Sequence, residues 1–140
     1  MKLILSAIVG GIVLFFLGWI FYVLIFGGFM MDNFGKIMRD PGDYKLWAVI
    51  VANFLEAFFL AWIYPKGYKG GAPAKEGFMF GIYIGLLMSV PFVFYIWAQY
   101  PVTWQAALLD GILMLIMTII TGLVIGLVYG KIEGKKEAAG

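Results

Sequence analysis

The chain has 140 residues, of which 64% are hydrophobic and 13% are charged, with ten Lys+Arg against eight Asp+Glu. A typical soluble domain has about 45–50% apolar and about 25% charged residues, so this sequence has too few polar side chains to cover a water-soluble globule. The composition therefore excludes a soluble enzyme, a disordered chain and a nucleic-acid-binding module.

Four apolar segments are long enough for transmembrane helices, which need about 20 residues. The first covers residues 3–26; it is too long for a signal peptide and has no small-residue cleavage site, so we expect an uncleaved helix. The others cover residues 45–64, ending at Pro65, residues 77–98 and residues 105–129. Such long runs without alternation form helices in lipid. The sequence predicts one domain over residues 1–140: an all-α integral membrane four-helix bundle of two antiparallel helical hairpins.

Two segments lie outside these spans. Residues 32–39 begin at Asp32, a good N-cap, and place apolar side chains on one face before the chain breaks at residues 40–43. Either a short amphipathic helix on the membrane surface or an irregular loop fits this pattern. The tail, residues 131–140, is charged and contains glycine, and we expect it to be frayed.

The basic residues predict the orientation. Seven lie on the side that holds both termini and three on the other: Lys2, Lys66, Lys69, Lys75, Lys131, Lys135 and Lys136 against Lys36, Arg39 and Lys45. The positive-inside rule therefore predicts that both termini are cytoplasmic. Aromatic residues near the span ends form two expected belts: Tyr44, Trp47, Trp97, Tyr100 and Trp104 outside, and Trp62, Tyr64, Tyr68 and Tyr129 inside.

Small residues recur every fourth position in the last two spans. They are Gly77, Gly81, Gly85 and Ser89, followed by Thr118, Gly122, Gly126 and Gly130. Such stripes allow helix backbones to approach closely in lipid, so we expect these two helices to pack on one another, although glycine is also simply common in membrane helices. Pro91 removes a backbone donor and predicts a helix kink beyond mid-membrane.

Two carboxylates lie within the apolar segments. Glu56 is near the middle of the second span, with Asn53 on the same helix face, and Asp110 lies near the start of the fourth. A carboxylate in the bilayer core is costly and usually marks a site. Three interpretations stay open: a proton- or cation-linked ligand site, structural hydrogen bonds between helices, or, for Asp110 alone, an interfacial position in contact with water.

The sequence contains no catalytic constellation. It has no Cys and no His, and it offers neither a nucleophile beside a base, nor metal-ligand spacing, nor a phosphate-binding loop. The two acids lie at depths that differ by roughly 5 Å or more, which disfavours an aspartyl dyad. We expect no enzyme, no metal and no cofactor.

The segments Gly18 to Tyr22 (GWIFY) and Leu108 to Gly111 (LLDG) resemble a family of small bacterial four-helix inner-membrane proteins of unassigned function. The resemblance covers nearly the whole chain and implies a four-helix membrane fold without an activity; the absence of His departs from that family's last helix. The intramembrane Glu is similar to that of small multidrug carriers, but Glu56 lies on the second helix rather than the first.

These observations favour a small non-enzymatic membrane protein that acts through helix packing with itself or with a membrane partner. The alternative is a proton- or cation-linked carrier or binder of a small solute that uses Glu56 and Asp110, with Asn53 as support. The lipid bilayer is the expected partner in both cases, and nucleic acid in neither.

Overall fold

The computed structural model describes residues 1–138, with side chains for residues 1–132. The described chain is all-helical, as expected, and its elements are α1 Lys2–Trp19, the π-helix η1 Ile20–Ile25, α2 Gly27–Phe34, the 3₁₀ turn η2 Pro41–Asp43, α3 Leu46–Gly67, α4 Pro73–Gln99 and α5 Trp104–Ala138. Four stretches are long and apolar enough to cross a membrane: Lys2–Ile25, Leu46–Gly67, Pro73–Gln99 and Trp104–Ile132. These correspond to the four segments predicted from hydropathy.

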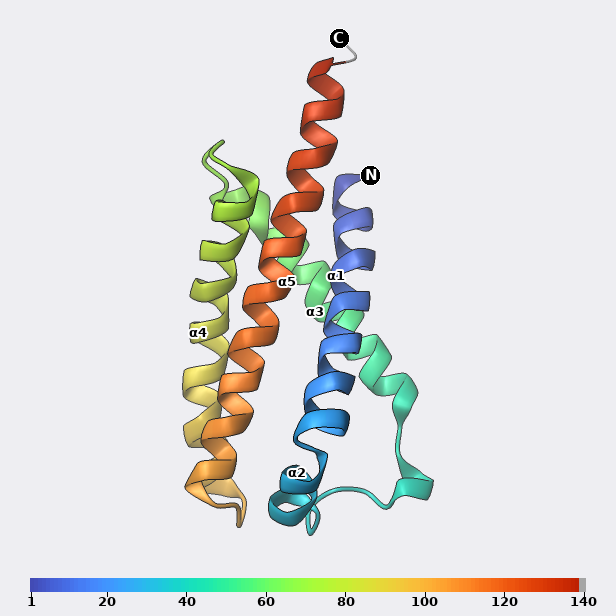
Figure 1. Ribbon diagram of the computed structural model, residues 1–140, viewed down its shortest axis with the longest axis vertical. Helices are drawn as coiled ribbons and strands as arrows, with labels where there is room; N and C mark the ends of the chain where they lie inside the picture. The colour runs from blue at the N-terminus through green and yellow to red at the C-terminus, as the bar shows by residue number, and fades with distance from the viewer. Residues whose placement is uncertain (139–140) are drawn as a thin grey trace.

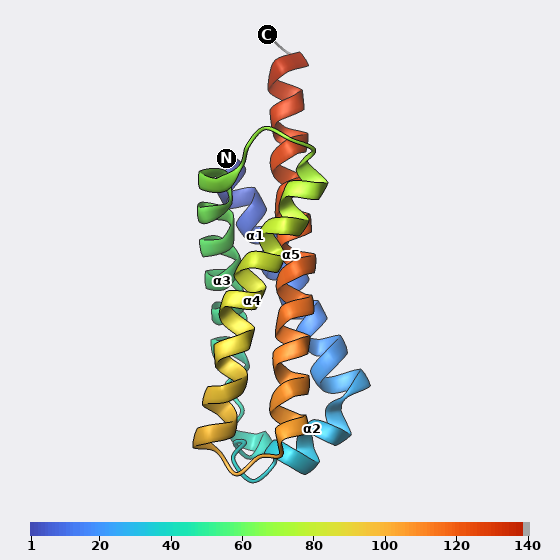
Figure 2. The same ribbon diagram turned by 90° about the vertical axis from the view of Figure 1, so that its left-hand side faces the viewer.

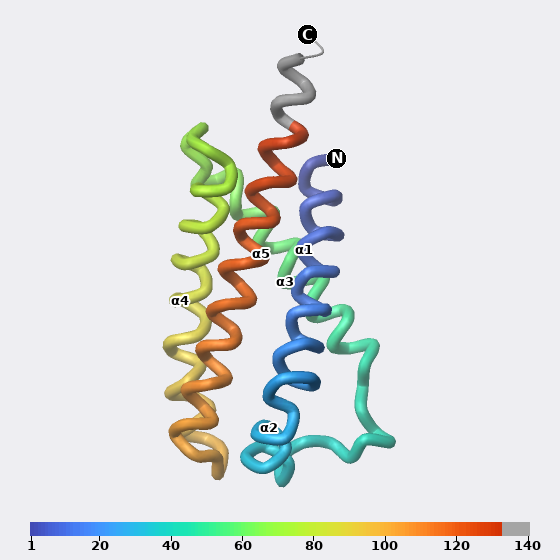
Figure 3. Tube along the Cα trace, viewed as in Figure 1, coloured from blue at the N-terminus to red at the C-terminus, as the bar shows by residue number. Residues whose placement is uncertain are grey.

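The four long helices form an elongated bundle (Figure 1). Helices α4 and α5 lie side by side along most of their shared length (Figures 1 and 2), and α1 packs against α3 and α5. Helix α3 makes little contact with α4, and its beginning lies away from the other helices (Figure 3). We call the end of the bundle that holds the start of α1 the N-terminal end, and the opposite end, which holds α2, the α2 end.

Aromatic and small side chains close the N-terminal end of the bundle. Ala61 and Tyr64 of α3 are buried against Ile125 of α5. The Tyr64 ring contacts the rings of Phe80 and Tyr129, with centroids 5.4 Å apart in both pairs. Tyr64 is only 2% exposed, so it belongs to the core and not to the aromatic belt in which we expected it.

The short helix after the first span lies earlier than predicted. Helix α2 covers Gly27–Phe34, not residues 32–39, and Asp32 is in its last turns and does not cap its start. The chain leaves η1 at Phe26, whose backbone is not helical, and begins a new helix at Gly27. Asn33 donates from its amide to the carbonyl of Phe29 within α2. Phe34 packs against Val93, Val102 and Ala107 near the turn between α4 and α5, so α2 closes the α2 end.

Helix α3 continues through Pro65 to Gly67, whereas we expected it to stop at this proline. Proline has no N–H to donate to the carbonyl four residues earlier, which here is that of Ala61. The hydroxyl of Tyr129 donates a hydrogen bond to this carbonyl at 3.3 Å. The contact from α5 supplies the donor that Pro65 lacks, and the helix can therefore contain it.

Helix α4 is likewise unbroken at Pro91. Beyond the proline, Val93 still packs against Gly111 of α5, so α4 and α5 stay together; the kink itself stays a prediction. Helix α5 extends to Ala138, so the frayed tail that we predicted for residues 131–140 is helical over residues 131–138, and residues 139–140 lie outside the described chain. Good helix formers, Lys, Glu and Ala, dominate this tail, which explains why the helix continues.

Candidate functional site

The two stripes of small residues face one another across the α4–α5 interface. A Cβ added to Gly77 would lie 2.9 Å from the Cα of Gly126, and one added to Gly81 would lie 2.7 Å from the Cα of Ile119. A Cβ on Gly122 would in turn meet the Cα of Gly81 at 2.7 Å. The backbones therefore touch with no room for a side chain, and this contact holds two of the four long helices as one unit.

The ends of both stripes are in the same interface. Gly85 faces Leu115 and Thr118, and Gly130 packs on Pro73 at the start of α4. Ser89 and Thr118 are buried, and the Thr118 hydroxyl donates to the carbonyl of Met114 in its own helix. The structure thus brings all eight small residues of the two stripes into one interface within the chain.

Glycines of α1 lie where α1 packs against α3 and against the α4–α5 pair. A Cβ on Gly10 would lie 3.2 Å from the Cβ of Ala57 in α3 and 3.4 Å from Cγ2 of Thr121 in α5. Gly18, two turns further along α1, faces Met117 of α5. Close packing at these two positions brings the end of the first span against the beginning of α5, where Asp110 lies.

The Tyr22 hydroxyl donates a hydrogen bond to Oδ1 of Asp110, with an O–O distance of 2.5 Å. Tyr22 belongs to η1 and Asp110 to α5, and both side chains are half-buried. Asp110 therefore has a donor within the protein and is not simply an interfacial carboxylate in water. This bond joins the first and last spans near the α2 end of the bundle.

Glu56 lies near the same tyrosine. Its carboxylate contributes to the electrostatic field at the Tyr22 hydroxyl, as that of Asp110 does. Glu56 is half-buried on α3, next to the fully buried Ala57. No described residue makes a hydrogen bond or ion pair with its carboxylate. Asn53, which we expected to support Glu56, instead donates to the carbonyl of Val49 in its own helix at 2.9 Å.

We therefore treat Tyr22 of η1 and Asp110 of α5, which share a hydrogen bond, and Glu56 of α3, whose charge acts on the same hydroxyl, as one candidate acidic site. Lys and Arg lie in the loops and at the ends of the four spans, and no Lys or Arg side chain in the described part of the chain makes an ion pair with Glu56 or Asp110. Among the described residues no group of three His, Cys, Asp or Glu side chains could hold a metal ion. Two carboxylates and a phenol are hard oxygen ligands, and they can hold a proton or a small cation.

Sequence analysis missed Tyr22 as a member of this site. A tyrosine near the end of an apolar run has the signature of an interfacial belt residue, and nothing local distinguishes it. Its segment is a π-helix of six residues, Ile20–Ile25, a distortion that is rare and is frequent at functional sites.

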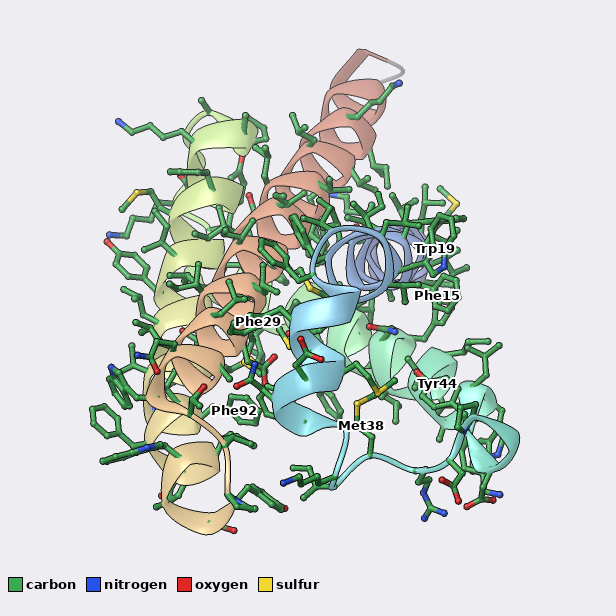
Figure 4. The ribbon with its side chains drawn as sticks, turned by 60° about the horizontal axis from the view of Figure 1, so that its bottom comes forward. Phe15, Trp19, Phe29, Met38, Tyr44 and Phe92 are labelled. Carbon is green, nitrogen blue, oxygen red and sulfur yellow. The ribbon has the colours of Figure 1, made fainter. Side chains whose placement is uncertain are left out.

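Figure 4 views the α2 end with its side chains. Phe15 and Trp19 lie on the side of α1 that is turned away from α4 and α5, whereas Phe29 of α2 lies toward α5 (Figure 4). The outward aromatic residues are suited to contact with lipid.

No protein-family model, curated protein or solved structure matches this chain.

Proposed function

We propose that this chain is a small, non-enzymatic integral membrane protein that binds a proton or a small cation, alone or as part of a protonated solute, at Tyr22, Glu56 and Asp110. The observation that supports this most directly is the half-buried Glu56, which has no hydrogen-bond partner among the described residues and whose charge acts on the same Tyr22 hydroxyl that donates to Asp110. A structural role explains Asp110, which ties two helices together. It does not explain Glu56, which has no hydrogen-bond partner among the described residues.

The physical argument concerns charge compensation. A carboxylate within a bilayer costs at least about 2.5–3.5 kcal/mol when it has no partner. Two carboxylates near one phenol also repel one another, which disfavours the doubly charged state. A bound proton or cation removes both costs. Loading and unloading of this ligand couples to any solute that shares the site, which is the chemistry of a carrier.

The test is an infrared titration of the full-length protein in lipid vesicles, since protonated carboxyl groups have a separate C=O band. We expect Na⁺ to shift the pH dependence of the wild-type band, and this effect of Na⁺ is the response that is compared between variants. Glu56→Gln should remove this response, and Tyr22→Phe should alter it. Asp32→Asn is the matched control, because it removes an exposed carboxylate outside the spans, and it should leave the response unchanged. A response that survives Glu56→Gln would overturn the proposal.

A flux measurement with the same variants separates binding from transport. Vesicles that contain a pH-sensitive dye report proton movement when a cation gradient is applied. A carrier moves protons in the wild type and loses this in Glu56→Gln, whereas a binder shows the infrared response without flux. Equal flux in the wild type, in Glu56→Gln and in protein-free vesicles would leave the protein a binder only.

The orientation belongs to the same proposal, with antiparallel hairpins in a bacterial inner membrane and both termini in the cytoplasm. The excess of basic residues at the N-terminal end supports it. Because the chain has no cysteine, single cysteines can be introduced at Gly42 and Gly67, around which there is open space. An impermeant maleimide should label Gly42→Cys in intact cells and Gly67→Cys only after lysis; the reverse pattern would contradict the orientation.

Action through packing with itself or a membrane partner stays a prediction. The two stripes of small residues that suggested such packing lie against each other within the chain. An interface with another protein must therefore use a different surface. Detergent-solubilised protein of uniformly monomeric mass would argue against self-association.

A further inference from the structure

A groove with a volume of about 720 Å³ opens between α3 and α4 at the N-terminal end of the bundle. Its mouth is formed by the loop that joins these helices, with Tyr68, Lys69 and Lys75, and its floor continues along α4 to Tyr83. This groove lies at the opposite end of the molecule from the acidic site, and the proposed function does not use it.

The loop at the mouth has a defined shape because Glu76 holds it. The two carboxylate oxygens of Glu76 accept hydrogen bonds from the backbone N–H groups of Lys69, at 2.8 Å, and Gly71, at 2.6 Å. Between them, Gly70 has a φ of +80°, a conformation that favours glycine. The Tyr68 hydroxyl donates to the Gly71 carbonyl at 3.1 Å. The negative charge of Glu76 is thus directed into the loop backbone.

Unlike Glu76, Lys69 and Lys75 leave their charged groups exposed at the mouth of the groove. The side chains of Lys69 and Lys75 are exposed, line the groove and make no ion pair with any described residue. Nearby Lys66 lies over the Trp62 ring, 4.5 Å from its centroid, and does not line the groove. The mouth of the groove therefore presents two uncompensated cations next to a carboxylate that is already engaged.

The rest of the groove is apolar and follows the span. Met79, Phe80 and Tyr83 line it below the lysines, and Tyr83 is 64% exposed. From Lys75 to Tyr83 the helix rises roughly 12 Å at 1.5 Å per residue. The groove thus leads from cations at the membrane boundary to apolar surface at the depth of acyl chains. A small dissolved anion has no apolar group that could pack against this wall.

We infer that the groove is a binding site for an anionic phospholipid, with Lys69 and Lys75 at its phosphate and Met79 and Tyr83 along its acyl chain. Charge complementarity selects an anionic headgroup over a zwitterionic one, and the position of the apolar wall selects a lipid over a soluble phosphate. Basic pockets between membrane helices bind anionic headgroups in this way. This inference goes beyond the proposed function and is independent of it.

The experiment measures lipid retention by native mass spectrometry of full-length protein from vesicles of phosphatidylglycerol and phosphatidylcholine in equal amounts. We expect wild-type protein to retain phosphatidylglycerol preferentially. Each lysine near a headgroup contributes about 1 kcal/mol, or about fivefold in affinity. Lys69→Gln/Lys75→Gln should therefore lower the retained phosphatidylglycerol on the order of twentyfold. The charge-conserving Lys69→Arg/Lys75→Arg should keep it.

The matched control is Lys36→Gln/Lys131→Gln, which removes the same charge from exposed lysines that do not line the groove. Retention should be unaffected there, and Tyr83→Ala should weaken it without abolishing the preference for the anionic headgroup. Equal retention of both lipids, or an equal loss in the control variant, would overturn the inference. Displacement of the lipid by millimolar inorganic phosphate would also overturn it, because the site would then take a free anion.

Discussion

The hydroxyl of Tyr129 donates a hydrogen bond to the carbonyl of Ala61, which is the carbonyl that Pro65 leaves without a helical donor. The two residues are 68 positions apart in sequence. A hydrogen bond from α5 therefore satisfies the carbonyl that the proline leaves free, at the place where Ala61 and Tyr64 of α3 also pack on Ile125 of α5.

Tyr129→Phe should lower the free energy of unfolding by about 1 kcal/mol, because it removes this donor but keeps the ring in the aromatic cluster. The measurement is reversible unfolding in mixed detergent micelles. Tyr95→Phe, at a tyrosine that is 64% exposed, is the matched control. In a Pro65→Ala background the backbone N–H at position 65 can again donate to the Ala61 carbonyl, so Tyr129→Phe should lower the free energy of unfolding by clearly less. An equal loss in both backgrounds would contradict this role of Pro65.

Gly81→Ala should destabilise the α4–α5 pair by about 1–3 kcal/mol, the usual cost of overpacking. Its Cβ would lie 2.7 Å from the backbone of Ile119, which cannot rotate away as a side chain could. Gly28→Ala introduces the same methyl group into open space in α2 and should leave stability unchanged or slightly higher. Equal effects of both substitutions in the same unfolding measurement would show that the close approach has no energetic weight.

The hydrogen bond from Tyr22 to Asp110 should have a coupling energy of about 1 kcal/mol in a double-mutant cycle of Tyr22→Phe and Asp110→Leu. Asp110→Asn keeps an oxygen that can accept the bond, so it should retain most of this stability while it removes the charge. That difference separates the structural role of Asp110 from its proposed role in ligand binding. A coupling energy near zero would mean that the bond does not hold η1 to α5.

Thr103 links two segments at the α2 end. Its hydroxyl oxygen accepts a hydrogen bond from the backbone N–H of Ala106 at 3.2 Å and so acts as the N-cap of α5. The same hydroxyl donates a hydrogen bond to Oδ1 of Asn33 at 2.8 Å. Thr103→Val should cost about 1 kcal/mol and accelerate amide hydrogen exchange in the first turn of α5. Thr103→Ser keeps the hydroxyl and should show near-normal exchange; if it behaves like Thr103→Val, the methyl group and not the cap is important.

The exposed ion pairs of the loop before α3 give a pH prediction. Hydrogen bonds from Lys45 and Arg39 lower the pKa of Asp43. The ionised form is therefore favoured in the folded loop, and this stabilisation is present above the ordinary pKa of Asp and is lost as the pH falls through the lowered pKa. In an NMR titration Lys45→Gln should raise the Asp43 midpoint toward its ordinary value. Lys36→Gln should not move it, and identical midpoints in both variants would refute the pairing.

The spans were predictable because about 20 consecutive apolar residues have one stable form in lipid. The four-residue spacing of Gly77, Gly81 and Gly122 likewise placed them on helix faces, although spacing alone could not say which neighbour each face would meet. The ends of elements were less predictable. Pro65 looked like a stop because its missing donor is local, whereas its compensation by Tyr129 comes from another helix.

The acidic site was predictable only in part. Glu56 and Asp110 stood out because carboxylates are rare in apolar runs. Tyr22 did not, since η1 is a π-helix and its wider turn changes the direction of side chains relative to regular α-helical spacing. Asn53 shares a helix face with Glu56, but its short side-chain amide donates a hydrogen bond to a backbone carbonyl of its own helix instead.

Gly10 meets both Ala57 of α3 and Thr121 of α5, so any tilt of α3 against the other helices would pivot at this three-helix crossing. In such a tilt the α4–α5 pair, whose backbones are in direct contact, would stay in place, and α3 would move relative to it. The start of α3 lies roughly 16 Å from Ala57 along the helix axis, so a small tilt sweeps it through a wide arc. Glu56, the immediate neighbour of Ala57, stays almost still during such a tilt, while the space on its α2 side widens or narrows.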